Sequence, residues 1–252
     1  NTIVNSLQKT DNAIKIAMVG KYVTLADSYV SVNEALKHAS ASIGRSVNID
    51  WIDSETLNGN MKQLDNFDGV LVPGGFGTRG SEGIIDTATY ALEKNIPYLG
   101  ICFGFQLAAI AFGRKICNLE NANSTEIIAD IKNPIIDLLP EQKDETDMGG
   151  SLRLGANEIK INQDSLAYKI YNSDKISKRH RHRYEFNTNY RDEFLKKGMI
   201  FSGESDNGKR MEILEIPTHK FFLGVQFHPE FNSRPGFPED VFKTFVTVAS
   251  QN

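Results

Sequence analysis

The chain is poor in cysteine and has no long hydrophobic run. Its 252 residues include two cysteines, Cys102 and Cys117, and one tryptophan. Two cysteines cannot form a disulfide framework, so we expect a reducing compartment, with the cytoplasm as the default. The one stretch that resembles a membrane span, residues 97–113, contains Gln106 and three glycines and is too short. We therefore expect no membrane partner, and a buried strand followed by a buried helix fits this stretch better.

A strong excess of either charge is also absent. Lysine and arginine number 28 against 32 acidic residues, a formal net charge of −4, which argues against general binding to nucleic acid. A chain of this length with 40% hydrophobic residues can bury a sizeable core in one large domain. The first residue is Asn1, and residues 1–12 are polar and aperiodic. We interpret them as the remnant of a linker in a longer protein, ahead of one domain over residues 13–252.

Apolar segments alternate between strand and helix periodicity through the first half, with strands predicted at 13–20, 47–52, 70–73 and 97–101 and helices at 82–94 and 103–113. This order predicts an α/β fold with a mostly parallel central sheet flanked by helices. A capping box at Ser31–Glu34 predicts the start of the first helix, and Gly44 its end. Residues 117–155 are irregular and include an acidic run over 141–147. Beyond them the second half is predicted to be richer in strands, at 158–161, 184–187, 199–203, 211–216 and 221–227, before a final helix at 241–249.

A cysteine stands between two glycines where a predicted strand meets a predicted helix, in Gly100-Ile101-Cys102-Phe103-Gly104. This spacing is typical of a nucleophile elbow, a strained turn whose neighbours must lack side chains. A parallel sheet binds its ligands beyond the carboxyl ends of its strands, where this cysteine falls. A small buried hydrophobe is an equally good interpretation of the cysteine alone.

A thiol nucleophile needs a base and a group that orients the base. His228 follows the predicted strand 221–227, and Glu230 is placed to bond its second ring nitrogen if the turn at Pro229 curls back. A histidine at a strand end is also often only structural. We expect no metal ligand here, since the nearest other histidine is His219.

The glycine-rich segment Pro73-Gly74-Gly75-Phe76-Gly77 supplies backbone N–H groups that can approach a developing oxyanion closely. A simple loop is the alternative. A phosphate cradle is not expected, because no Gly-Lys-Ser/Thr follows the glycines.

Together these residues resemble the class I, triad-type glutamine amidotransferases, which carry Pro-Gly-Gly, Gly-x-Cys-x-Gly and His-Pro-Glu in this order. Within that family the sequence is similar to the glutaminase domains of CTP synthases. The matching blocks span almost the whole chain: Gly20 to Val23, Asp27 to Leu36, Pro73 to Gly80, Glu120 to Glu126, Arg179 to Asn187 and Phe227 to Phe231.

The resemblance implies a catalytic triad of Cys102, His228 and Glu230. It implies an oxyanion hole at Gly75 and Phe103. The glutamine-holding residues it implies are Gly74, Phe76, Gln106, Glu126, Arg183 and Tyr184. The charges of Glu126 and Arg183 fit these roles, since a carboxylate can pair the α-ammonium of glutamine and a guanidinium can bind its α-carboxylate. From composition alone, a solvated loop or a nucleic-acid patch is the better interpretation of the basic run 178–183, and the resemblance reverses that order for Arg183 only.

The resemblance further implies an N-terminal synthetase domain, absent from this sequence, that uses ATP, magnesium and UTP to make CTP, with GTP as an activator and a homotetrameric assembly. This domain itself is expected to need no cofactor or metal and to act on L-glutamine. Two alternatives stay open. One is another thiol hydrolase of the same fold, such as a γ-glutamyl hydrolase, and the other is a regulatory module without turnover.

Overall fold

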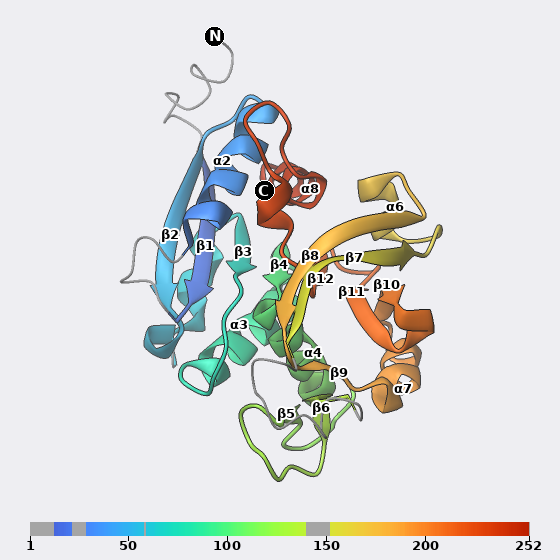
Figure 1. The fold of residues 1–252 in the computed structure, drawn as a ribbon. Coiled ribbons are helices and arrows are strands. Elements are labelled where there is room, and N and C mark those ends of the chain that lie inside the picture. The colour runs from blue at the N-terminus through green and yellow to red at the C-terminus, as the bar shows by residue number, and fades with distance from the viewer. Residues whose placement is uncertain (1–12, 22–28, 58, 140–151, 252) are drawn as a thin grey trace.

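The computed structural model describes residues 13–21, 29–57, 59–139 and 152–251 (Figure 1). The predicted linker remnant over 1–12 and the acidic run over 141–147 lie outside these residues. Among the described residues, no helix is long and apolar enough to cross a membrane.

A nine-stranded sheet forms the centre of the molecule, and its first five strands are parallel. In spatial order these are β2 (Val47–Asp53), β1 (Ile14–Gly20), β3 (Gly69–Val72), β4 (Tyr98–Ile101) and β12 (Phe222–Val225). Val70 and Phe222 both pair with Tyr98, which fixes β4 between its neighbours. Strands β3, β4 and β12 are buried at every position, as expected for short apolar strands covered on both faces.

The other four strands continue the sheet in antiparallel pairing: β11 (Arg210–Glu215), β10 (Ile200–Ser205), β7 (Arg153–Ile161) and β8 (Lys175–His182). Strands β7 and β8 form a long curved ribbon, yellow to orange in Figure 1. A separate three-stranded sheet contains β5 (Asn123–Ser124), β6 (Pro134–Asp137) and β9 (Glu185–Phe186).

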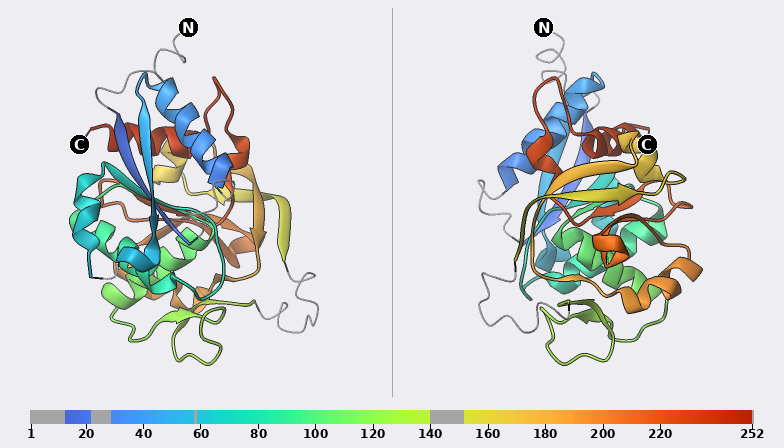
Figure 2. Two further views of the ribbon diagram at one scale, coloured as in Figure 1. Left: turned by 90° about the vertical axis from the view of Figure 1, so that its left-hand side faces the viewer. Right: turned by 45° about the vertical axis from the view of Figure 1, so that its right-hand side comes forward.

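Helices cover both faces of the parallel strands. α3 (Ser81–Lys94) and α4 (Phe103–Lys115) pack into one apolar cluster, and α2 (Val30–Ser42) and α8 (Asp240–Ala249) into another. In the left view of Figure 2, α3 and α4 lie toward the bottom and α2 and α8 toward the top. The short helices α6 (Leu166–Tyr171) and α7 (Arg191–Lys196) accompany the antiparallel strands. Single 3₁₀ turns occur at Ser54–Leu57, Met61–Asn66, Thr188–Tyr190, Asp206–Gly208 and Pro229–Asn232.

The predicted fold class is confirmed, with its parallel half and its strand-rich second half. The predicted capping box is wrong. α2 begins at Val30, so Ser31 lies inside the helix, and Tyr29 at the N-cap makes no side-chain capping bond. Gly44 follows the helix end with φ 72°, a conformation that favours glycine.

The sequence pattern does not predict β8, α6 or α7, and β7 begins inside the region predicted to be irregular. β8 was missed because its buried positions are His180 and His182, which no search for apolar alternation detects.

Candidate active site

Cys102 occupies the sharp turn between β4 and α4. Its backbone has φ 52° and ψ −96°, a region that non-glycine residues avoid, and this strain is typical of a functional turn. The Cys102 N–H donates to the carbonyl oxygen of Val225 on β12 at 2.7 Å, which anchors the turn to the neighbouring strand. The cysteine is 5% exposed. It therefore lies in a fixed position at the carboxyl edge of the parallel strands.

The two flanking glycines are required by contact with backbone. A Cβ on Gly100 would lie 2.6 Å from the carbonyl group of Gly104, and one on Gly104 would lie 2.3 Å from the carbonyl oxygen of Val72. Backbone atoms cannot move aside as a flexible side chain can. The Gly-x-Cys-x-Gly pattern thus reflects how closely α4 starts against β3 and β4.

His228 follows β12, and hydrogen bonds hold both its backbone and its ring. Its backbone N–H donates to the carbonyl oxygen of Arg179 at 2.8 Å. Its ring Nδ1 lies 2.7 Å from Oε1 of Glu230. The turn Pro229–Asn232 curls the Glu230 carboxylate back toward the ring, as the spacing requires. The His228 ring also interacts electrostatically with Cys102, and the two residues line the same pocket.

The pKa of His228 is raised to about 10. Burial alone would lower it, but the hydrogen bonds and negative charges of Cys102 and Glu230 outweigh burial and favour the imidazolium. The second carboxylate oxygen of Glu230 is buried and has no hydrogen-bond partner among the described residues. The arrangement can therefore hold a protonated imidazole between a thiol and a carboxylate.

Other groups approach the Cys102 sulfur. The thiol donates to the carbonyl oxygen of Arg181 on β8 at 3.8 Å, and Nε2 of Gln226 lies 3.8 Å from the sulfur. Gln226 is fully buried and also accepts from Nε2 of Gln106 at 3.4 Å.

A pocket opens in front of the cysteine and histidine. Its walls come from the glycine-rich loop, the end of β8, the turn after β12 and the start of α2: Tyr29, Ser31, Val32, Pro73, Gly74, Gly75, Phe76, Cys102, Arg181, His228, Glu230 and Phe231. A Cβ on Gly74 would lie 2.8 Å from Cε1 of His228, so only glycine lets the loop come this close. A Cβ on Gly75 would make an ordinary 3.6 Å contact with Phe103. Phe103 is the first residue of α4, where a helix leaves its N–H groups available to a ligand.

The predicted glutamine-holding residues divide into two groups. Gly74 and Phe76 line the pocket, whereas Gln106, Glu126, Arg183 and Tyr184 lie around it and do not line it. Gln106 is buried and donates to the carbonyl oxygen of Tyr184 at 2.9 Å. The guanidinium carbon of Arg183 lies 5.9 Å from the centre of the Tyr184 ring.

Glu126 is tied to the glycine-rich loop, because its Oε1 accepts the Gly77 N–H at 2.7 Å. Burial raises its pKa, against the opposing effects of this bond and of Lys21 and Arg183. Glu126 and Arg183 are thus close enough to interact by charge.

Several groups at the site were not predicted from the sequence, and Lys21 makes the most contacts with the glycine-rich loop among them. It is 4% exposed, and its ammonium donates to the carbonyl oxygens of Phe76, at 3.0 Å, and Gly77. The ammonium also lies 4.1 Å from the centre of the Phe103 ring. Burial lowers the pKa of Lys21 to about 8. The sequence blocks quoted above contain or adjoin Lys21, Arg181 and Gln226. Their contacts with backbone groups, and with residues that themselves line the pocket, have no signature in the sequence.

A cluster of residue types that can bind a metal ion lies on β8 and β11. Candidate ligand atoms of His180, His182 and Glu212 are within 4.8 Å of one another. However, both oxygens of the Glu212 carboxylate are engaged, one by Arg153 and Ser205 and the other by His180. A guanidinium on the same carboxylate disfavours a cation, so a hydrogen-bonded ionic network describes the cluster better.

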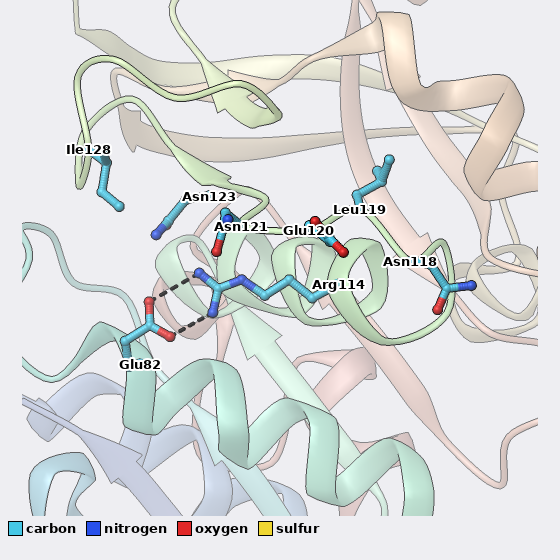
Figure 3. A pocket seen from close by; sticks show the side chains of 8 residues that line it. All are labelled: Glu82, Arg114, Asn118, Leu119, Glu120, Asn121, Asn123 and Ile128. Atoms are coloured by element: carbon cyan, nitrogen blue, oxygen red, sulfur yellow. Dashed lines mark hydrogen bonds and ion pairs between the residues drawn. The ribbon is translucent and has the colours of Figure 1, made fainter.

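A second hollow in the surface lies away from the cysteine, at the far end of α4 (Figure 3). Arg114 crosses it and bonds both carboxylate oxygens of Glu82 on α3, at 2.6 and 3.1 Å. Arg114 is twelve residues beyond Cys102 on the same helix, which corresponds to about 18 Å. The hollow is therefore separate from the thiol.

Comparison with known proteins identifies the family. The model of the class-I glutamine amidotransferases matches residues 24–248. The chain belongs to this amidotransferase family. It is 36% identical to the Trypanosoma brucei CTPS glutaminase domain with bound acivicin, with a TM-score of 0.89 over 95% of each chain. The expected resemblance to CTP synthase glutaminase domains is thus confirmed.

Curated relatives of this amidotransferase domain support the same grouping. CTP synthase of Halalkalibacterium halodurans is 51% identical over 98% of this chain and 47% of its own length. That of Archaeoglobus fulgidus is 52% identical over 93% of this chain and 44% of its own length. The chain therefore spans about half the length of the curated relatives it matches. A Thermotoga maritima glutamine amidotransferase, 14% identical with a TM-score of 0.56, shares the fold.

Proposed function

We propose that this amidotransferase domain hydrolyses L-glutamine through a thioester on Cys102. The observation that carries the proposal is the position of His228, whose ring bonds Glu230 at 2.7 Å and interacts electrostatically with Cys102 in the same pocket. The thiolate is the nucleophilic form of a cysteine, and the His228 ring is the group at this site that can hold the thiol proton.

In the first half-reaction the Cys102 sulfur attacks the side-chain amide carbon of glutamine. The N–H groups of Gly75 and Phe103 stabilise the oxyanion that forms. His228 then gives its proton to the amide nitrogen, the carbon–nitrogen bond breaks, and ammonia leaves. A γ-glutamyl thioester remains on Cys102.

In the second half-reaction His228, now neutral, takes a proton from water as the water oxygen attacks the thioester carbon. The carbon–sulfur bond breaks and glutamate is released, which restores the thiolate and the imidazolium. Glu230 keeps the ring oriented in both steps, because its carboxylate bonds Nδ1 and leaves the other side of the ring facing the sulfur.

Glutamine recognition is assigned to charged groups near the pocket. We propose that Glu126 pairs the α-ammonium and Arg183 clamps the α-carboxylate, with Gly74, Phe76, Gln106 and Tyr184 completing the site. The electrostatic interaction between Glu126 and Arg183 supports this pairing.

The ammonia is proposed to aminate UTP to CTP in a synthetase domain of the same protein, in pyrimidine nucleotide biosynthesis. The names of the relatives and their roughly twofold greater length support this proposal. ATP, magnesium and UTP would then belong to that other domain, with GTP as an activator and a cytoplasmic homotetramer as the assembly.

The test is labelling with 6-diazo-5-oxo-L-norleucine, a reactive glutamine analogue, followed by peptide mapping. We expect one label per chain on Cys102, slower labelling in His228→Ala, and unchanged labelling in the matched control Cys117→Ala. Burial raises the pKa of Cys117 to about 12, so that thiol is unreactive. A label on Cys117, or none on Cys102, would contradict the proposal. Hydrolysis of free glutamine in preference to γ-glutamyl peptides separates this function from that of a γ-glutamyl hydrolase.

A further inference from the structure

Strand β8 holds the two reacting residues through its backbone. The carbonyl oxygen of Arg179 accepts the N–H of His228 at 2.8 Å, and that of Arg181 lies 3.8 Å from the Cys102 sulfur. These carbonyls belong to alternate residues of one strand. The position of β8 therefore sets where the histidine and the cysteine lie relative to each other.

The residue between these two carbonyls, His180, is 1% exposed. Its Nε2 lies 2.9 Å from Oε2 of Glu212, and its Nδ1 lies 3.0 Å from the carbonyl oxygen of Lys178. Successive side chains of a strand point to opposite faces, so His180 anchors β8 from the side away from Arg179 and Arg181.

Glu212 is fully buried and its carboxylate is saturated with donors. Besides His180, it accepts from Arg153 and from the Ser205 hydroxyl, the latter at 2.5 Å. Burial alone would raise the pKa of Glu212, but these partners outweigh it and lower the pKa to about 2. A buried charge with this many partners can shift only at a high cost in free energy, so it fixes what is bonded to it.

Glu212 also supports the other side of the site. Its backbone carbonyl accepts the N–H of Gln226 at 2.8 Å, and the Gln226 side chain reaches the Cys102 sulfur at 3.8 Å. The ring of Phe227, the next residue, lies 6.0 Å from the His180 ring in an edge-on contact. One residue thus joins β8 to the segment that ends in His228.

We infer that Glu212 and His180 are positioning residues of the amidotransferase reaction, whose buried pair fixes β8 against the end of β12 so that Cys102 and His228 meet. The inference rests on the proposed function, because the reaction that these residues would accelerate is the proposed hydrolysis of glutamine. Neither residue contacts the pocket, and both act through the carbonyls of Arg179 and Arg181.

The decisive variant is Glu212→Gln, which keeps the shape of the side chain, removes its charge and replaces one accepting oxygen by a donating amide group. We expect kcat for glutamine hydrolysis to fall about tenfold, because a small displacement of reacting groups is costly, while KM stays within about twofold. The matched control is Glu158→Gln on β7. Glu158 pairs with Lys175 of the same ribbon in an exposed ion pair, so the control should leave kcat and KM unchanged.

A second measurement is independent of turnover. NMR titration of the His228 ring should give a pKa near the value of about 10 in the unaltered chain and a lower value, nearer 6.5, in Glu212→Gln. If the unaltered chain does not hydrolyse glutamine, the proposed function fails and this titration alone decides the inference. A folded Glu212→Gln chain with unchanged kcat and unchanged titration overturns the inference, as does a rise in KM alone.

If Glu212→Gln does not fold, Lys178→Met replaces it. Lys178 precedes Arg179 on β8 and bonds the buried Glu239 at 2.6 Å. Lys175→Met, on the exposed face of the same strand, is its control. A fall in kcat for Lys178→Met that is absent from the control supports the inference, and equal kinetics of variant and control overturn it.

Discussion

The parallel strands β1, β3, β4 and β12 bury apolar residues, whereas the antiparallel strand β8 buries two histidines and β11 buries two carboxylates among its apolar residues. Residues 69–72 of β3 are apolar and fully covered, while β11 buries Glu212 and Glu215 and β8 buries His180 and His182. The proposed catalytic side chains all follow parallel strands. The antiparallel half contributes backbone carbonyls held by a buried ionic network. An amidotransferase site of this kind therefore combines strand-end side chains from one half with a rigid cover from the other.

The largest effect is expected for the nucleophile of the parallel half. Cys102→Ser should lower glutamine hydrolysis at least about a thousandfold, since the loss of a nucleophile removes the covalent route. Glutamate release under saturating glutamine measures it, with Cys117→Ala as the control. Retention of more than a tenth of the activity in Cys102→Ser would show that the thiol is not the nucleophile.

The two halves should also differ in their tolerance of a methyl group on glycine. In Gly104→Ala the new Cβ would lie 2.3 Å from the Val72 carbonyl oxygen, and in Gly203→Ala 2.6 Å from Cγ1 of Ile213. Backbone cannot yield as a side chain can. We expect the free energy of unfolding to fall by about 3 kcal/mol in Gly104→Ala and by about 1 kcal/mol in Gly203→Ala. Denaturant unfolding measures both, and an equal loss would remove this distinction between the halves.

The folding stability should depend on a buried histidine of the antiparallel half at acid pH, and on the histidine that follows a parallel strand at alkaline pH. Burial, with the neighbouring charge of His180, lowers the pKa of His182 to about 3. Below its ordinary pKa of about 6.5 the unfolded chain binds a proton that the folded chain does not, so stability falls as pH decreases. His182→Gln should reduce the loss between pH 7 and 5 by about 2 kcal/mol.

His228 supplies the contrast within this prediction. Its pKa is raised to about 10, so its contribution to stability is complete below pH 6.5 and is lost as pH rises through 10. His228→Gln should therefore leave the loss of stability between pH 6.5 and 5 in place. An equal loss of folding stability between pH 7 and 5 in the unaltered chain and in His182→Gln would contradict a lowered pKa of the buried histidine.

The smallest effect is expected at the hollow of Figure 3. Arg114→Met breaks the ion pair with Glu82 at the far end of α4. Because this end lies away from the pocket, kcat and KM should change by less than about twofold. A larger change in either would mean that the hollow communicates with the thiol.

The same difference between halves determined what the sequence could predict. Apolar alternation located β1, β3, β4, α3 and α4 to within a few residues, and the spacing around Cys102 and His228 indicated which strand ends meet. The buried positions of β8 are histidines, and in β11 the buried Glu212 is a carboxylate. In sequence such residues are indistinguishable from solvated ones, so this half of the site was missed.

Backbone contacts form the other part that sequence could not supply. The carbonyl of Arg181 at the thiol and the carbonyls of Phe76 and Gly77 at the Lys21 ammonium depend on where the chain passes. Any residue type offers the same carbonyl group. Only the packed structure shows that the basic block 178–183 covers the site with its backbone.

Rapid acid quenching tests whether Cys102 carries a γ-glutamyl group during turnover. The chain is mixed with glutamine, quenched within the first turnovers and weighed intact, then mapped by peptide mass. We predict a mass gain of one γ-glutamyl group on the peptide that contains Cys102, absent in Cys102→Ser. Release of glutamate at full rate without any γ-glutamyl group on Cys102, or with the group on another residue, would contradict the account.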